Sequence, residues 1–226
     1  LPGSVRQQVS LAYLFCRIAD TIADTRLIPL HKRLGALRVL QEQFMLASPP
    51  LLPLEKLQCA VFPHQEGEGE RLLFSHLSEC FRIFESFSST DQQYIRELVL
   101  TLTRGMEMDL HYFPEDTSVM VRALPDLPTL DLYTYYVAGV VGEFWTKLHI
   151  AHLPALQHCN SEGLCRLGIN FGKGLQLTNI LKDLAKDFHH GRCYLPQEQL
   201  AHLHMHVNEL RKPEALLRIR PLIYKL

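Results

Sequence analysis

The chain contains 226 residues, of which 47% are hydrophobic and 21% are charged, and its formal net charge is -1. This composition excludes disordered and collagen-like proteins, and the length is enough for one sizeable domain or two small ones. A near-zero charge gives no overall field for nucleic acid or an anionic membrane, so an anionic ligand must be bound by local groups.

Apolar residues recur at three- and four-residue spacing along most of the chain, which predicts an all-α fold. In chain order, helices are expected near residues 4–25, 30–46, 69–88, 90–112, 130–153, 161–190 and 196–209, followed by a last helix from about 213. Proline-containing loops are expected at 47–69 and 114–128.

Several side chains are suited to begin these helices. Thr90 and Gln93 form a candidate capping box for the fourth helix. Asn160 or Ser161 can cap the sixth helix, and Pro213 suits the first turn of the last one.

Cysteine usage and hydropathy favour a protein of the reducing cytoplasm. The six cysteines form no CxxC pair, and most have apolar neighbours, as small buried residues do. No uncharged stretch reaches the roughly 18 apolar residues that a membrane-spanning helix needs. The chain opens Leu1-Pro2-Gly3-Ser4 without a basic and apolar leader, which suggests a trimmed N-terminus.

Two of the predicted helices carry a polar stripe that ends in a pair of aspartates. In the first helix, positions i, i+4, i+7 and i+11 are Tyr13, Arg17, Asp20 and Asp24. In the sixth helix, positions i, i+3, i+7 and i+11 are Gln176, Asn179, Asp183 and Asp187. Because these spacings return to the same side of an α-helix, each stripe is expected to occupy one face.

The paired aspartates indicate a magnesium site. Like charges at i and i+4 repel, so a helix gains nothing from them unless a cation neutralises the pair. Magnesium prefers oxygen ligands and binds through one or two carboxylates together with waters and substrate phosphates. A single acidic pair is more often solvated surface, but two pairs that each extend into a polar stripe favour metal ions that hold a diphosphate.

Three segments resemble motifs of the squalene and phytoene synthase family. Residues 13–24, YLFCRIADTIAD, are similar to its first aspartate-rich motif. Residues 175–187, LQLTNILKDLAKD, followed by GRCYLP at 191–196, are similar to its second. Residues 133–142, YTYYVAGVVG, resemble the tyrosine and Val-Ala-Gly segment that lies between them.

This resemblance implies an isoprenoid synthase-type helical bundle with a central active-site cavity, and magnesium-dependent head-to-head joining of two prenyl diphosphates. By position in the motifs, the implied magnesium ligands are Asp20, Asp24, Asp183 and Asp187, with Asn179 assisting. The implied phosphate contacts are Arg17, Lys182 and Arg192, and further substrate-binding residues are Tyr13, Gln176 and Tyr194. Tyr133 would lie near the reacting carbons.

The implied substrates leave the product open. Two farnesyl diphosphates would give squalene or a related C30 product through presqualene diphosphate, with NADPH as a further cofactor if the product is squalene. The alternative is phytoene from geranylgeranyl diphosphate. Residues 133–142 resemble squalene synthases more, whereas GMEMDL at 105–110 and GRCYLP at 191–196 look more like bacterial phytoene or dehydrosqualene synthases. A product this apolar is compatible with association at the periphery of a membrane.

Two other hypotheses of function are compatible with the same fold class. A class I terpene cyclase shares the metal chemistry, but its usual motifs differ from these. A non-catalytic assembly or interaction protein with the same fold would be expected to lose metal ligands, and here all four aspartates are present. Residues 1–226 are expected to form a single isoprenoid synthase domain that lacks the family's first helix and its C-terminal helices.

Some residues are expected to be structural. Glu107 and Asp109 point to different sides of their helix and are interpreted as structural or surface residues. The glycines at 168, 172 and 174 lack a preceding strand, so helix packing is favoured over a dinucleotide-binding loop. The small residues Ala138, Gly139 and Gly142 would let either a substrate or a neighbouring helix approach closely.

Overall fold

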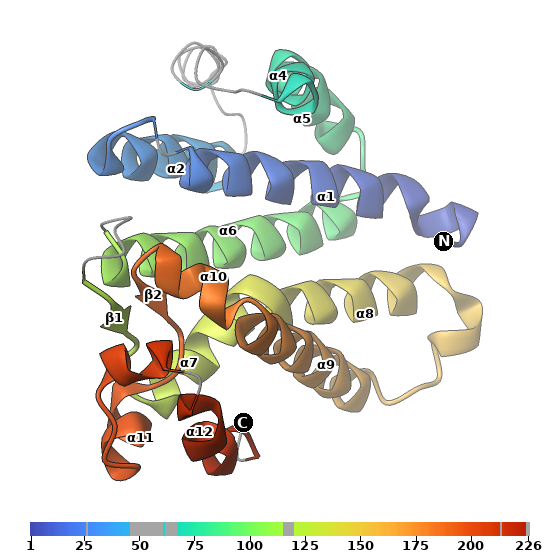
Figure 1. Ribbon diagram of the computed structural model, residues 1–226. Helices are drawn as coiled ribbons and strands as arrows, with labels where there is room; N and C mark the ends of the chain where they lie inside the picture. The colour runs from blue at the N-terminus through green and yellow to red at the C-terminus, as the bar shows by residue number, and fades with distance from the viewer. Residues whose placement is uncertain (26, 46–60, 62–66, 115–119, 213, 225–226) are drawn as a thin grey trace.

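The computed structural model describes residues 1–25, 27–45, 61, 67–114, 120–212 and 214–224. Within these ranges the protein is almost entirely helical, which confirms the all-α prediction, and helices pack on both sides of the long helix α6 (Figure 1). The strands in these ranges are two short segments, β1 (Arg122–Ala123) and β2 (Arg192–Cys193), which pair in parallel.

Three long helices agree with the sequence prediction to within one residue. They are α1 (Gly3–Asp24), α2 (Leu30–Met45) and α6 (Ser89–Tyr112). The cap of α6 differs from the prediction, because the Ser88 side chain accepts the hydrogen bond from the Asp91 N–H. The capping box expected at Thr90 is therefore wrong.

The helix expected at 69–88 is divided at His76 into α4 (Glu68–Ser75) and α5 (Leu77–Glu85). The prediction of one helix is therefore wrong. Apolar residues continue at helical spacing across the break, so their periodicity does not indicate it. Most of the predicted loop before it, residues 47–60 and 62–66, lies outside the described residues.

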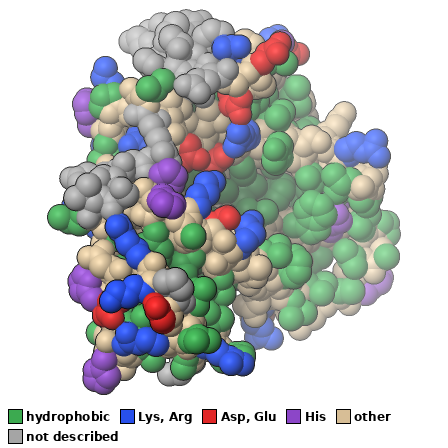
Figure 2. Space-filling model, in the orientation of Figure 1, with side chains coloured by type: hydrophobic (Ala, Val, Ile, Leu, Met, Phe, Trp, Pro, Cys, Tyr) green, Lys and Arg blue, Asp and Glu red, His purple; other side chains and the backbone are tan. Residues whose placement is uncertain are grey.

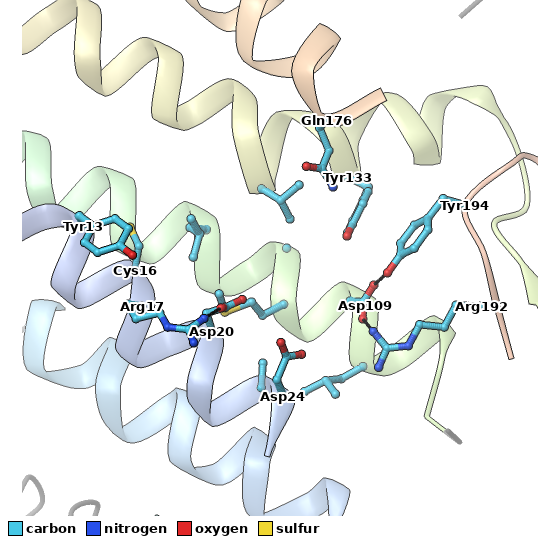
Figure 3. Close-up of a pocket in the computed structure, with 16 residues that line it drawn as sticks. Tyr13, Cys16, Arg17, Asp20, Asp24, Asp109, Tyr133, Gln176, Arg192 and Tyr194 are labelled. Atoms are coloured by element: carbon cyan, nitrogen blue, oxygen red, sulfur yellow. Dashed lines mark hydrogen bonds and ion pairs between the residues drawn. The ribbon is translucent and has the colours of Figure 1, made fainter. Parts of the chain in front are cut away.

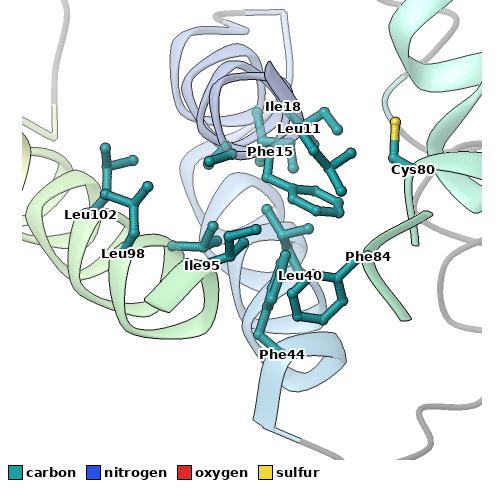
Figure 4. Packing of buried hydrophobic residues seen from close by; sticks show 14 of the residues in the cluster. Leu11, Phe15, Ile18, Leu40, Phe44, Cys80, Phe84, Ile95, Leu98 and Leu102 are labelled. Atoms are coloured by element: carbon teal, nitrogen blue, oxygen red, sulfur yellow. The ribbon is translucent and has the colours of Figure 1, made fainter. Parts of the chain in front are cut away.

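An aromatic cluster joins α1, α2 and α5 (Figure 4). The rings of Phe15 and Phe44 meet edge to face with centroids 4.9 Å apart, and Phe81 and Phe84 pack against both. Edge-to-face pairs add to the free energy of burying large apolar side chains. This core fixes α1, which carries the first aspartate pair.

The helix expected at 130–153 begins earlier and contains a π-helical turn. Helix α7 (Leu127–Thr134) starts after Asp126, whose side chain accepts a hydrogen bond from the Thr129 N–H at 2.8 Å. The π turn η2 (Tyr135–Gly139) leads into α8 (Val140–His152). Of the loop predicted at 114–128, residues 115–119 lie outside the described residues, and the rest includes β1 and the start of α7.

Helices α8 and α9 (Ser161–Lys182) cross at glycines. A methyl group added at Gly168 would lie 2.6 Å from the Gly142 carbonyl oxygen, and one at Gly172 would lie 3.2 Å from the Gly139 Cα. These positions confirm helix packing as the role of Gly168 and Gly172, and they show that the close neighbour of Gly142 is a helix. For Gly174 the prediction is wrong, because this glycine is exposed and no described atom lies within 4 Å of a methyl group added there. Asn160 caps α9 by accepting a hydrogen bond from the Gly163 N–H at 3.0 Å.

The predicted helix 161–190 is interrupted at Asp183, where φ is -94° and ψ is 6°, and continues as α10 (Leu184–His189). The continuous-helix prediction is therefore wrong, and the second stripe runs across a bend. A turn follows at Gly191, whose φ of 72° suits glycine, and leads into β2.

The helix expected at 196–209 is also wrong. Helix α11 (Gln197–His202) ends early, His204 has a positive φ of 51°, and a 3₁₀ turn follows at Val207–Arg211. The last helix, α12 (Ala215–Ile223), lies where one was expected, and Pro213 lies outside the described residues. Among the helices described here, none is long and apolar enough to cross a membrane.

Candidate active site

A cavity of about 450 Å³ lies between α1, α6, α7, η2, α9 and β2 (Figure 3). Its lining includes these residues that the sequence singled out: Tyr13, Arg17, Asp20, Asp24, Tyr133, Gln176, Arg192 and Tyr194. Asn179, Lys182, Asp183 and Asp187 are not in its lining. Figure 2 shows the molecule in the orientation of Figure 1, with acidic and basic side chains near the centre of the face in view and apolar side chains to their right.

The aspartates of α1 form one edge of the cavity. Arg17 Nη1 donates a hydrogen bond to Asp20 Oδ2 at 2.7 Å, and Arg17 Nη2 donates one to Glu70 Oε1 of α4 at 2.7 Å. Burial and repulsion from Asp24 raise the pKa of Asp20, and the neighbouring Arg17 opposes this rise only in part. Two carboxylates therefore lie along this edge, and the Arg17 guanidinium that pairs with one of them is also bonded to Glu70 of α4.

A largely buried carboxylate, that of Asp109 of α6, forms the opposite wall. Arg192 Nη1 donates a hydrogen bond to Asp109 Oδ2 at 2.8 Å, and Tyr194 Oη donates one to Asp109 Oδ1 at 2.5 Å. The Tyr133 ring stacks on the Tyr194 ring with centroids 4.9 Å apart. Burial raises the pKa of Asp109, while Arg192 and Tyr194 lower it. Asp109 therefore organises three of the residues that the motifs indicated.

The structural or surface interpretation of Asp109 is incomplete, since its carboxylate lines the cavity. Glu107 is not in that lining. A signal for Asp109 was present in the GMEMDL segment at 105–110, which resembles family members. Helical spacing within α6 could not show that this side chain meets Arg192, which lies 83 positions away in the sequence.

The second aspartate pair lies at the bend between α9 and α10. Lys182 Nζ donates a hydrogen bond to Asn179 Oδ1 at 3.3 Å and lies 3.6 Å from Asp183 Oδ2. Burial raises the pKa of Asp187 to about 6, with added repulsion from Asp183 and Asp109 and an opposing effect of Arg192. Asp109 also interacts with Asp24, so it is electrostatically coupled to both aspartate pairs.

Tyr133 is 7% exposed, and its hydroxyl is directed toward the Asp109 group (Figure 3). Burial, followed by the charge of Asp109, raises the pKa of Tyr133 well above its usual value. The phenol therefore stays protonated at neutral pH. It can donate a hydrogen bond into the cavity wall without adding charge there.

The carboxylates fit magnesium ions that arrive together with a diphosphate. Within the described residues, no three or more His, Cys, Asp or Glu side chains are close enough to hold an ion by themselves. Magnesium commonly uses only one or two carboxylates and completes its shell with waters and phosphate oxygens. Repulsion between Asp20 and Asp24, and between Asp183 and Asp187, would be relieved by such cations.

Comparison with known proteins gives a consistent result. The family model described as squalene/phytoene synthase matches residues 1–226. A presqualene diphosphate synthase from Sinorhizobium fredii is 31% identical over 89% of this chain and 57% of its own length. Squalene synthase ERG9 from Gibberella zeae is 26% identical over 84% of this chain and 37% of its own. A 15-cis-phytoene synthase from Pantoea ananas is 28% identical over 94% of this chain and 58% of its own.

The solved structure of TcSQS with the ligand BPH1237 has the same fold, with a TM-score of 0.71 and 20% identity. That match covers 99% of this chain and 59% of the other. The chain thus spans about half the length of the relatives that it matches.

Proposed function

Because the chain belongs to the squalene/phytoene synthase family, we propose that it is a magnesium-dependent prenyltransferase that joins two prenyl diphosphates head to head. One observation carries the proposal: the aspartates of α1 line the same cavity as Tyr133, Arg192 and Tyr194, which come from distant motifs. We take residues 1–226 as one domain of this type.

The residues proposed to hold magnesium are Asp20, Asp24, Asn179, Asp183 and Asp187. When bound, magnesium would act as a Lewis acid that neutralises the diphosphate leaving group. Arg17, Lys182 and Arg192 would contact phosphate oxygens as charge-assisted donors. Tyr13, Gln176 and Tyr194 would complete the substrate contacts.

The apolar surface beside the charged cavity supports an amphiphilic substrate. Figure 2 shows apolar side chains beside the charged ones, and the exposed large apolar side chains of α8 and α9 are Val141, Trp145, Leu167, Phe171 and Leu175. Large contiguous apolar patches on a protein surface mark contacts with ligands, membranes or other proteins. They would take the hydrocarbon tails, while the protonated Tyr133 would face the reacting carbons. Exclusion of water protects an allylic cation from being quenched.

The proposed substrates are two farnesyl diphosphates, which would give squalene or a related C30 product through presqualene diphosphate. Phytoene formation from geranylgeranyl diphosphate is the second candidate, favoured by GMEMDL at 105–110 and by the phytoene synthase relative. NADPH would be required only for squalene. We propose a cytoplasmic location at the periphery of a membrane, because the product is apolar.

The test incubates the full chain with labelled farnesyl or geranylgeranyl diphosphate and magnesium, with and without NADPH, and identifies the extracted lipids. Asp20→Ala and Asp183→Ala are the inactive controls. Squalene that forms only with NADPH supports the main proposal. Dehydrosqualene or phytoene would change the product but keep the chemistry. If the protein with magnesium consumes neither farnesyl nor geranylgeranyl diphosphate, the hypothesis of a non-catalytic assembly or interaction protein replaces the proposal.

A further inference from the structure

Arg17 is shared between two carboxylates that come from different helices. One guanidinium nitrogen bonds Asp20, three positions along α1, and the other bonds Glu70 in the first turn of α4, each at 2.7 Å. Arg17 and Asp20 line the cavity, whereas Glu70 is not in its lining. Among the described residues, Glu70 therefore reaches the site through its hydrogen bond with Arg17.

Glu70 is held in this position by its own helix. Its carboxylate accepts a hydrogen bond from its own backbone N–H, at the end of α4 where negative charge is favoured. The carboxylate also folds back over Gly67, where an added methyl group would lie 2.8 Å from the Glu70 Cδ. One turn further on, the fully buried Phe74 anchors α4 in the core.

The shared geometry limits how strongly Arg17 can pair with Asp20. A guanidinium with no other partner tends to bind one carboxylate through two parallel hydrogen bonds. Here Glu70 occupies the second nitrogen, so Asp20 receives one bond from Arg17. A carboxylate held by one such bond keeps more oxygen lone pairs available to a cation than one held by two.

We propose that Glu70 is a positioning residue: it draws one half of the Arg17 guanidinium away from Asp20, which leaves Asp20 available to magnesium and keeps Arg17 at the cavity edge for a diphosphate. This inference rests on the proposed function and deepens it. Without Glu70, Arg17 would close on Asp20 and compete with the metal ion.

The test uses Glu70→Gln, which removes the charge while keeping the shape, and Glu68→Gln as the matched control. Glu68 lies in the same first turn of α4 and is exposed. Inorganic diphosphate is titrated into the full chain with excess magnesium by calorimetry, and turnover is measured over a range of magnesium concentrations. For Glu70→Gln we expect about tenfold weaker diphosphate binding, a difference of about 1.4 kcal/mol. We also expect a higher magnesium requirement, with kcat at saturation nearly unchanged.

Glu70→Asp provides a second variant if Glu70→Gln folds poorly. It restores the charge on a shorter side chain, so its diphosphate affinity should fall between those of Glu70→Gln and the unmodified chain. Equal affinities for all the variants, Glu68→Gln included, would overturn the inference. So would a lower melting temperature and kcat with unchanged diphosphate affinity, since Glu70 would then only fasten α4 to α1.

The two proposals fail in different ways. If the unmodified chain binds magnesium and diphosphate but converts no prenyl diphosphate, the proposed function fails, and the calorimetric comparison still decides the role of Glu70.

Discussion

At the scale of single residues, the cavity wall contains a largely buried ion pair between Asp109 and Arg192. Their side chains are 13% and 16% exposed, and the nearest nitrogen and oxygen lie 2.8 Å apart. Removing one member of a buried pair leaves the other charge uncompensated, which costs more than losing a surface pair. Asp109 also accepts the hydrogen bond from Tyr194, so its loss would disturb the stacked tyrosines as well.

We predict that Asp109→Asn lowers the free energy of unfolding by about 3 kcal/mol. The matched control is Asp131→Asn, which loses an ion pair to Lys173 from a side chain that is 67% exposed, and it should cost less than about 1 kcal/mol. Urea unfolding of the two variants makes the comparison. Equal losses would show that Asp109 is not an organising residue.

The raised pKa of Asp187, about 6, makes stability depend on pH. The value in an unfolded chain is about 3.9. Because the folded state holds the proton more tightly, this residue favours folding below about pH 4, and the contribution is lost as pH rises through about 6. A half-buried carboxylate is partly screened by solvent, so the effect at neutral pH is limited to about 1 kcal/mol.

Asp187→Asn should therefore be more stable than the unmodified chain at pH 7.5 in metal-free buffer, and the difference should disappear near pH 4. Urea unfolding at several pH values with a chelator present measures it. A stability difference that is constant across this range would show that burial and repulsion do not control the Asp187 carboxyl. Added magnesium with diphosphate should reverse the order, because a neutral amide oxygen binds the ion more weakly than a carboxylate does.

At the scale of elements, helix separation is set by glycines. Gly168 of α9 faces the Gly142 carbonyl oxygen of α8, where an added methyl group would lie at 2.6 Å. Gly174 is exposed on the same helix, and among the described residues nothing lies within 4 Å of a methyl group added there. The two positions therefore separate the effect of packing from the effect of helix propensity.

We predict that Gly168→Ala destabilises the protein by about 2 kcal/mol, because the backbones of two helices must move apart. Gly174→Ala should instead stabilise it by about 0.5–1 kcal/mol, as alanine does in an exposed helix interior. Thermal and urea unfolding test both variants. A stabilising effect at both positions would mean that α8 and α9 can separate without cost.

The sequence predicted the elements whose information is local. Both polar stripes follow helical spacing in the sequence, and apolar periodicity predicts the bounds of α1, α2 and α6 to within one residue. Apolar periodicity predicts neither the breaks at His76 and Asp183 nor the π turn at 135–139, because a bend or one extra residue in a turn leaves the apolar spacing almost unchanged.

The missing parts of the site depend on tertiary contacts. Asp109 meets Tyr194 from 85 positions away, and Glu70 meets Arg17 from 53 positions away. Residue spacing within one helix cannot predict a contact between side chains so far apart in the sequence. The GMEMDL resemblance could have drawn attention to Asp109, whereas we find no sequence signal for Glu70.

At the scale of the whole molecule, the cavity lies beside a small core cluster. Tyr133 and Tyr194 belong to this cluster, together with Phe113, Leu124, Leu130 and Ile180. It joins residues of α7 and α9 with residues that directly follow α6, β1 and β2, while the larger cluster around Phe15 supports α1. Because one wall is buried core and the other is a charged helix edge, a ligand between them should stabilise the assembled helices.

We predict that magnesium and inorganic diphosphate together raise the melting temperature, and that either one alone has little effect. At a free ligand concentration 100 times its Kd, binding to the folded state alone adds about 2.7 kcal/mol, or roughly 5–10 °C for a domain of this size. The joint requirement follows because the described carboxylates form no three-ligand cluster, so the ion needs phosphate oxygens and the diphosphate needs the ion. The shift should be lost in Asp20→Asn combined with Asp183→Asn and kept in Asp131→Asn. An equal shift with diphosphate and a chelator would mean that Arg17 and Arg192 bind the anion unaided.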